Sequence, residues 1–561
     1  MTRKILVIIN LILVVVFITS CGTGNDNKTQ DQQQVIDTTP VKKLTVEERL
    51  KKYAVVPLNT DLSKLSEKDK KVISILIEAC KTMDDIFWLQ GYGQKDSLFA
   101  MLKTPEEKKL CEINFGPWDR LNNNEPFIEG VGKKPIGSGF YPPDIKYLPF
   151  IDMKFEDKLS MYTVIKRADD GSLYTQQYHI AYKEYLEKAS KLLKKAAGLS
   201  ENKEFANFLN LRADALLKDD FYESEISWMD METNNIDIVI GPIGSEEDRF
   251  INTKTDYEAY LLIKDIDWSN KMNVYSQTLS EIKNQLQLNN NYKNQIMFTK
   301  SNIGVYDAIY YGGWSNSGAK MLSINHPKDG RILMEKGSKK LQFKNVMKAK
   351  FDKVLQPISN ILISENQRKN IKFDAFFIDN LIYEIADAIV VKNTVNNKGH
   401  VKDALKDYYP TINSLKADIL NLFIITKLHE KGVIKEVDLL DNYVVFMANV
   451  LRSVRFGSTV SQGSSTLIWF NVLQDMQAFS RDEKTGTYTV NFDKMKTSVE
   501  QFSVTVLKIL AEGDYNAAKD LIENKGNMQP VLQQDLKRIS EAGIPTDIIF
   551  EQGDKVLGLS K

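Results

Sequence analysis

The sequence predicts an α+β protein of two lobes, one of mixed secondary structure followed by one that is mostly helical. Three observations support this class. Residues 236–240, 259–263 and 305–311 are apolar or β-branched runs, mostly flanked by Gly, Asn or Asp, as strands are. Residues 182–197 place their apolar side chains on one face at the spacing of an amphipathic helix. From about Lys339 onward, helical periodicity dominates.

Further helices are predicted in the first third of the chain. Residues 45–54 begin with a capping-box pattern, Thr45 followed three residues later by Glu48, and continue with apolar residues at helical spacing. Residues 67–88 show the same spacing over a longer stretch. Gly198 is expected to end the amphipathic helix described above.

The composition is that of a globular protein with a large core. The chain has 561 residues, of which 43% are hydrophobic and 10% aromatic. After the N-terminal region, about 515 residues remain, which is too many for one hydrophobic core. Basic and acidic residues number 74 each, and no long block of one sign occurs. The sequence therefore argues against a nucleic acid partner.

The N-terminus has the pattern of an export signal. Arg3 and Lys4 precede an apolar run over residues 5–18, which is too short to span a bilayer comfortably but suits a signal peptide. Small residues then lead to Cys21, and this arrangement resembles the lipobox of bacterial lipoproteins. We expect cleavage before Cys21 and lipid on its thiol, with a plain signal peptide containing a cysteine as the alternative.

The predicted organisation follows from this signal. Residues 1–20 are the signal peptide, and residues 21–45 are the lipidated cysteine with a polar, flexible tether. Residues 46–340 form the mixed lobe and residues 341–561 the helical lobe. Removing the signal leaves 72 basic and 74 acidic residues, a net charge of −2. No second long apolar run occurs, so we expect the lipid to be the only membrane anchor, on the exported side of a bacterial cell envelope.

Cysteine and histidine usage limits metal and redox chemistry. Besides Cys21 the chain has only Cys80 and Cys111, which are as consistent with buried free thiols as with a disulfide. The four histidines are scattered, which excludes any metal site that needs several histidine ligands close in sequence. No Walker loop, no CxxC and no GxGxxG at a helix start occurs, and we expect no cofactor.

Several dispersed segments resemble one peptidase family. Residues 373–430 read as two amphipathic helices joined by a turn, beginning FDAFFIDNLIYEIADAIVVKN. Together with NFGPWDRLNNNEPFIEG, DIVIGPIGSEED, VYDAIYYGGW, RSVRFG and AFSRDEKTGTY, they are similar to the dipeptidyl peptidase III family, in its bacterial branch of zinc-dependent hydrolases. The resemblance runs from about residue 60 to the end. It implies a cleft between a lobe with a β-barrel-like sheet and a helical lobe.

The resemblance implies a zinc site that this sequence lacks. The family has HExxH on the first helix, where two histidines bind zinc and the glutamate is the general base, and a third ligand, glutamate, on the second helix. Those ligand positions fall here on Tyr383, Asp387 and Ser414. Only the base position is kept, as Glu384. We expect Glu384 to be a relic paired within its helix or with Lys416.

Other family positions also differ. The family's transition-state histidine falls on Gln462, and its substrate-holding glutamate and tyrosine fall on Gly244 and Glu246. Its INxPN segment keeps the first asparagine, Asn325, and replaces the second. Together with Trp469, these residues are the predicted lining of the cleft.

Three hypotheses remain open at this stage. The first is a membrane-anchored pseudo-peptidase that has lost zinc and binds peptide or protein in its cleft. The second is an active hydrolase that uses Glu384 and Asp387 as a carboxylate pair without zinc, a pair better suited to a weak Ca²⁺ or Mg²⁺ contact than to zinc. The third is a structural surface protein without a cleft. A cleft lined by Tyr383, Glu384, Asp387 and Trp469 would favour the first over the third.

Overall fold

A computed structural model describes residues 43–298, 301–456 and 461–559 and confirms the α+β class. Residues from Thr45 onward group as one compact unit. The helices before the sheet are α1 Val46–Leu50, α2 Glu67–Gly91, α3 Lys95–Phe99, α4 Pro105–Asn114, α5 Tyr147–Asp152, α6 Tyr178–Ala181, α7 Lys183–Leu199, α8 Lys203–Ala215 and α9 Tyr222–Asp230. No helix within the described ranges is both long and apolar enough to cross a membrane.

One five-stranded sheet dominates the middle of the chain. Its strands are β6 Ile236–Gly244, β7 Asp256–Lys264, β9 Ser301–Gly313, β10 Ser323–His326 and β11 Ser338–Phe343. Four short helices interrupt them: α10 Ile266–Gln277, α11 Leu279–Gln285, α12 Asn290–Gln295 and α13 Gly330–Glu335. The predicted strands are thus confirmed as parts of β6, β7 and β9, each longer than the sequence pattern suggested.

The sheet is open, so the predicted barrel-like closure is wrong. Its strand order is β10-β11-β9-β7-β6, which leaves β10 and β6 as edges, and no closed barrel is found among the described residues. Side chains, not a strand ladder, connect these edges. Arg212 donates to the backbone oxygen of Ile240 on β6 at 3.3 Å and to Glu225 at 2.5 Å, and Glu225 contacts His326 of β10 at 2.6 Å.

This buried link holds a carboxylate in its charged form. Burial raises the pKa of Glu225, but the charges of Arg212 and His326 outweigh burial and hold it at about 2. A buried carboxylate with two partners is costly to disrupt, because removing one partner leaves an uncompensated charge.

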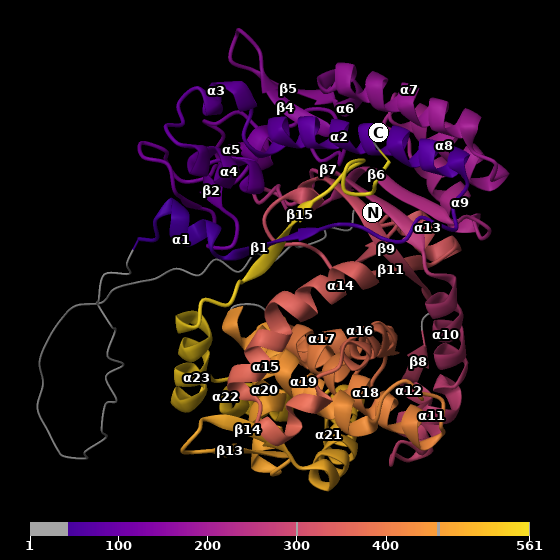
Figure 1. The fold of residues 1–561 in the computed structure, drawn as a ribbon, viewed down its shortest axis with the longest axis vertical. Coiled ribbons are helices and arrows are strands. Elements are labelled where there is room, and N and C mark those ends of the chain that lie inside the picture. Colours follow the sequence, from indigo (N-terminus) through magenta and orange to yellow (C-terminus); the bar gives the residue numbers. More distant parts are fainter. Residues whose placement is uncertain (1–42, 299–300, 457–460, 560–561) are drawn as a thin grey trace, which may run out of the picture. The chain divides into compact units, whose positions relative to one another are not determined.

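The remaining strands form two-stranded ladders. They are β1 Tyr53–Pro57 with β15 Asp547–Glu551, β2 Trp118–Asp119 with β3 Glu125–Pro126, β4 Thr163–Arg167 with β5 Leu173–Gln177, β8 Ile296–Phe298 with β12 Ile389–Val391, and β13 Phe479–Asp482 with β14 Thr487–Val490. Figure 1 shows β1 in indigo beside β15 in yellow, so the two ends of the described chain lie next to each other in a parallel pair.

The C-terminal part is mostly helical, as predicted. Its helices are α14 Lys344–Lys350, α15 Gln356–Leu362, α16 Phe373–Asp387, α17 Val401–Leu405, α18 Tyr409–Glu430, α19 Leu439–Ser453, α20 Ser461–Asp475, α21 Phe492–Glu512, α22 Tyr515–Lys525 and α23 Pro530–Glu541. Figure 1 shows them gathered in salmon, orange and yellow, away from α2 and α7.

Apolar side chains form two large buried clusters. One joins α2 and α7–α9 to the sheet, with Leu76, Leu193 and Tyr260 among its members. The other joins α14–α23 and includes Phe377 of α16 and Ile419 of α18. The two helices predicted around residues 373–430 therefore form and pack through their apolar faces.

Two predicted helices have different boundaries in the structure. The capping box at Thr45 and Glu48 forms, but α1 ends at Leu50, because the β-branched run that follows pairs with β15. Gly198 does not end its helix, since α7 continues to Leu199. The end of α1 is decided by tertiary structure, because a partner strand about 490 residues away is invisible in the local pattern.

Cys80 and Cys111 are both free and buried. Burial raises the pKa of the Cys80 thiol well above its usual range and that of Cys111 to about 12. Of the two alternatives that the sequence left open, free thiols are therefore confirmed.

Candidate functional site

The positions predicted for the zinc site lie on two helices that pack together. Tyr383, Glu384 and Asp387 belong to the last turns of α16, and Ser414 belongs to the first turns of α18. Tyr383 and Asp387 are four residues apart, so they lie on one face of α16. The tertiary structure thus places all four predicted residues at one helix–helix contact.

A lysine from the sheet faces the carboxylates of this site. Lys340 of β11 donates from Nζ to Glu384 Oε2 at 2.9 Å and to the backbone oxygen of Glu384 at 3.0 Å, and lies 3.5 Å from Asp387 Oδ2. The side chains of Lys340 and Glu384 are 7% and 14% exposed, against 44% for Asp387. The Glu384 pair is therefore shielded from water, and the Asp387 contact is weaker.

Strand register explains why Lys340 points at α16. In the β10–β11 ladder, Asn325 lies opposite Lys340 and Ser323 lies opposite Gln342. Directly opposed residues share one face of a sheet, as do residues two apart on one strand. This face meets α16, where Ser323 also contacts Glu384 at 3.3 Å.

The predicted pairing of Glu384 with Lys416 is wrong. Lys416 donates instead to the backbone oxygen of Ile389, and to Asp387 O and Asn413 Oδ1 at 3.4 and 3.2 Å. Burial lowers the pKa of Lys416 to about 8. The Lys416 ammonium thus donates hydrogen bonds to backbone carbonyls at the end of α16 and just after it, where carbonyls lack donor partners within the helix.

Tyr383 and Ser414 are held in a network of hydroxyl groups. Burial raises the pKa of the Tyr383 phenol well above its usual value, and the nearby charges of Asp418, Asp387 and Glu384 act in the same direction. The Ser414 hydroxyl lies 3.1 Å from that of Ser465, which donates to Asp418 Oδ2 at 2.9 Å. The phenol therefore stays protonated at any physiological pH.

A cavity of about 370 Å³ opens beside these helices. Its walls come from α16, α18, α19, α20 and the β10–β11 face, and include Tyr383, Glu384 and Trp469. Trp469 stacks on Phe446 of α19, with ring centroids 4.4 Å apart. Tyr383, Glu384 and Trp469 thus line one cavity, whereas Asp387 is not among the lining residues.

Three buried polar atoms in this cavity have no hydrogen-bond partner. They are Asp379 Oδ2 on α16, Asn421 Oδ1 on α18 and Gln342 Nε2 on β11, in side chains only 1–3% exposed. The other Asp379 oxygen accepts from Asn442 Nδ2 at 2.8 Å. Because buried polar groups are almost always paired, three lining residues that each carry an unpaired polar atom make this cavity the candidate ligand site.

Two carboxyl groups of the cavity have displaced pKa values. Burial raises the pKa of Asp379 well above its usual range. Burial also raises the pKa of Asp418 to about 7, against the effect of the hydrogen bond from Ser465. Perturbed carboxyl groups in a cavity indicate a functional site more often than a structural one.

Gly244, Glu246 and Asn325 are not among the residues that line this cavity. Gly244 is the last residue of β6 and Glu246 lies just beyond it, three strands from β11 in the sheet and on the order of 14 Å away at the usual strand spacing. Gly244 is tightly enclosed, because a Cβ there would lie 1.7 Å from Asp256 Oδ2. Glu246 and Asn325 are exposed. Gln462 lies on α20, and Cys21 falls outside the described residues.

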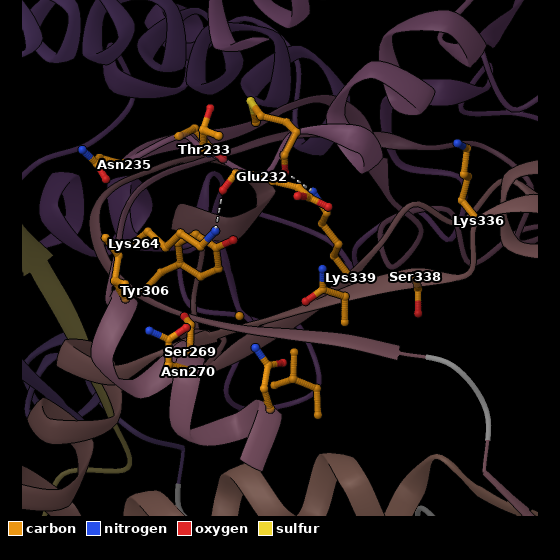
Figure 2. A pocket seen from close by; sticks show the side chains of 17 residues that line it. Glu232, Thr233, Asn235, Lys264, Ser269, Asn270, Tyr306, Lys336, Ser338 and Lys339 are labelled. Atoms are coloured by element: carbon orange, nitrogen blue, oxygen red, sulfur yellow. Dashed lines mark hydrogen bonds between the residues drawn. The ribbon is translucent and has the colours of Figure 1, made fainter. Parts of the chain in front are cut away.

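A second cavity is larger but lacks these signs of a ligand site. It has a volume of about 800 Å³ and lies at the end of the sheet where β9 and β11 begin. Figure 2 shows two of its lysines turned toward backbone oxygens: Lys264 donates to Glu232 O at 3.1 Å and Lys339 to Met231 O at 3.0 Å. None of the orphan polar atoms of the described residues lines this second cavity. We therefore favour the smaller cavity as the site.

Sequence reasoning missed Lys340, Asp379, Gln342 and Asn421. Asp379 carries a readable signal, because it is an acid in the middle of an apolar helix and falls on its buried side. Lys340 stands within a short strand whose residues are almost all buried. Within the part of the chain that the structure describes, no three His, Cys, Asp or Glu residues are arranged to hold a metal ion.

Comparison with known proteins identifies the fold. No family model matches the chain. The structure of DPP III from Caldithrix abyssi aligns with a TM-score of 0.85 and 33% identity, covering 90% of this chain and 98% of that one. Dipeptidyl-peptidase III from Corallococcus sp. strain EGB gives a TM-score of 0.74 and 30% identity, covering 90% and 96%.

A plant protein is also similar. Nudix hydrolase 3 from Arabidopsis thaliana is 29% identical over 575 aligned positions, which cover 91% of this chain and 74% of that protein. Both solved structures share the fold and about a third of the sequence over nearly their whole length. The chain therefore belongs to the dipeptidyl peptidase III family.

Proposed function

We propose that this protein is a lipid-anchored member of its family that binds peptide or protein in the cavity beside α16 and α18 without hydrolysing it. The observation that carries this proposal is the position of Lys340. Its ammonium lies against Glu384 and Asp387, two of the positions predicted for a general base and a metal ligand. The protein thus supplies its own cation where the resemblance implies a metal.

The donor groups present do not fit zinc. A zinc site needs three ligands from histidine, cysteine thiolate or carboxylate. Tyr383 is a buried phenol that stays protonated, and the Ser414 hydroxyl is an alcohol bonded to Ser465. Asp387 is a carboxylate, but it already faces the charge of Lys340. We therefore derive no catalytic step through zinc for this chain.

The same geometry argues against a zinc-free hydrolase. A pair of carboxyl groups that acts on water shares one proton, and each must approach the other rather than a cation. Glu384 and Asp387 both approach Lys340 instead.

Membrane anchoring is part of the proposal and rests on the N-terminal sequence. The export signal, the small residues before Cys21 and the polar tether support a mature protein that is tethered to a membrane by lipid. The cavity would then face the exported compartment.

The test is metal content and peptidase activity of the purified mature protein. We expect well under one zinc per chain by elemental analysis and no cleavage of dipeptidyl naphthylamides, with or without added zinc. Stoichiometric zinc, or chelator-sensitive cleavage that is lost in Glu384→Ala, would overturn the proposal.

A matched variant shows that the assay detects a working site. Tyr383→His, Asp387→His and Ser414→Glu together restore the three ligands on the same two helices. Lys340→Met added to these removes the competing cation. We expect zinc binding to be strongest in the fourfold variant, weaker in the triple variant and absent in the unmodified protein.

A further inference from the structure

The cavity beside α16 and α18 lacks a partner for its acidic end. Asp379 Oδ2 and Asn421 Oδ1 are unpartnered, and both side chains are 3% exposed. A buried oxygen without a donor costs about 1–3 kcal/mol, and more if it is charged. A ligand that brings hydrogen-bond donors to this end would remove that cost.

No cation of the described residues compensates the acids here. Burial, not an opposite charge, dominates the environments of Asp379 and Asp418, and the only charge near Asp418 with a resolved effect is that of Asp387. Lys340 is engaged by Glu384. The site therefore has room for one positive charge from outside.

The one cation in the cavity wall lies at the other end. Arg452 donates from Nε to Asn449 at 2.9 Å, near the end of α19. Asn442, which holds Asp379, is on the same helix ten residues earlier, on the order of 15 Å away at the helical rise. Arg452 thus lies near the opposite end of α19 from Asn442, and the environments of Asp379 and Asp418 show no effect of its charge.

The size and the walls fit an organic cation better than a metal ion. A cavity of about 370 Å³ holds a group of side-chain size, whereas Ca²⁺ needs six to eight oxygen ligands close together. The stacked rings of Phe446 and Trp469 offer an apolar wall for methylene groups. Gln342 Nε2, on the opposite wall, is an unused donor for a carbonyl oxygen.

We propose that this cavity recognises a primary ammonium group, held by Asp379 and Asn421 at the acidic end, with the attached chain along Phe446 and Trp469. The proposal rests on the proposed function and names the group that the binding site selects. An ammonium has three donors, which match the two orphan oxygens and the nearby Asp418 carboxyl. The ammonium can belong to a lysine side chain of a peptide or to a free amine.

The experiment is calorimetric titration of the purified mature protein with two probes. One is cadaverine, a free diamine, and the other is the peptide acetyl-Ala-Lys-Ala-amide, with acetyl-Ala-norleucine-Ala-amide as its uncharged match. Asp379→Asn replaces the carboxyl group by an amide but keeps an oxygen for Asn442. Asn421→Leu removes the second acceptor, and Asp374→Asn is the control, because Asp374 is an exposed residue on the first turn of the same helix.

We expect the lysine peptide, cadaverine or both to bind, and Asp379→Asn and Asn421→Leu each to weaken that binding by about tenfold or more, since a charge-assisted contact is lost. Asp374→Asn should bind as the unmodified protein does. Binding of the peptide alone assigns the ammonium to a lysine side chain, and equal binding of cadaverine assigns it to small amines.

Two results would overturn the inference. One is that neither probe binds, and the other is that binding survives unchanged in both Asp379→Asn and Asn421→Leu. Equal binding of the norleucine peptide would also reject ammonium recognition while leaving peptide binding intact. Zinc content and cleavage, measured on the same preparation, decide the proposed function separately.

Discussion

Removing the Lys340 ammonium tests the central feature of this site. In Lys340→Met the apolar stem is kept, but Glu384 loses its partner at 2.9 Å while its side chain remains only 14% exposed. The remaining side-chain contact of the Glu384 carboxylate is with the Ser323 hydroxyl, at 3.3 Å. We expect Lys340→Met to destabilise the protein and Glu384→Gln in the same chain to restore much of the loss.

The magnitude follows from the geometry. Two unit charges at 2.9 Å attract by about 6 kcal/mol at an effective dielectric constant of about 20. Desolvation offsets much of this attraction, and breaking one partner of a buried pair typically costs about 3–5 kcal/mol. Because Glu384 keeps some contact with water, we expect the low end, about 3 kcal/mol. In a chain of roughly 500 residues this shifts the melting temperature by about 3 °C.

The assay is a double-mutant cycle on Lys340→Met, Glu384→Gln and the combined variant, by denaturant unfolding followed by tryptophan fluorescence. A coupling energy of about 2 kcal/mol or more is expected for a shielded charge pair. Lys68→Met is the control, since Lys68 pairs with Glu201 at 2.8 Å but both side chains are more than half exposed, and its midpoint should barely move. A coupling energy below about 0.5 kcal/mol would refute the reasoning, because it is the value of an exposed pair.

Three further predictions concern other parts of the chain. Cys21→Ser should release the protein from the membrane fraction after a high-salt wash, and a processed variant that stays bound would reject lipid anchoring. Glu225→Gln should lower the melting temperature at pH 7, and the difference should narrow as pH falls from 5 to 2. The reason is that the pKa of Glu225 is about 2 in the folded protein and about 4.5 in the unfolded chain. The stability that the charged Glu225 carboxylate contributes is therefore complete above pH 4.5 and is lost as the pH falls toward 2. A difference in melting temperature that does not change with pH would contradict this. Cys80 and Cys111, buried thiols with raised pKa values, should react with a thiol reagent only after unfolding, and labelling of the native protein would contradict their burial.

Much of the secondary structure was readable in the sequence, because local patterns carry it. The capping box at Thr45, the helices α7, α16 and α18, and the strand cores of β6, β7 and β9 all formed where the sequence predicts them. Errors arose where a distant segment decided the outcome. The end of α1 depends on β15, and the open sheet depends on a buried link between Arg212, Glu225 and His326 rather than on any strand.

The resemblance to the family was also readable, because many segments in order carry it together, and the two solved relatives confirm it. It led to Tyr383, Glu384, Asp387 and Ser414, which the structure does bring to one contact between α16 and α18. It did not lead to the acidic end of the cavity. Asp379 was visible in the sequence as an acidic residue in an apolar helix, but only the tertiary structure shows that its Oδ2 has no hydrogen-bond partner.

By itself the sequence determined the fold class, the main helices and strands, and the residues at the positions predicted for the zinc site, since each depends on neighbours along the chain or on a match to the family. Only the tertiary structure decided what those residues face. Lys340 reaches Glu384 across 44 residues because strand register turns it toward α16. Asp379 Oδ2 and Asn421 Oδ1 stay without a partner among the described residues because α16 and α18 bury these side chains at the wall of the cavity. Local sequence patterns determine which side chains each helix or strand carries, and tertiary packing determines which charged side chains come into contact.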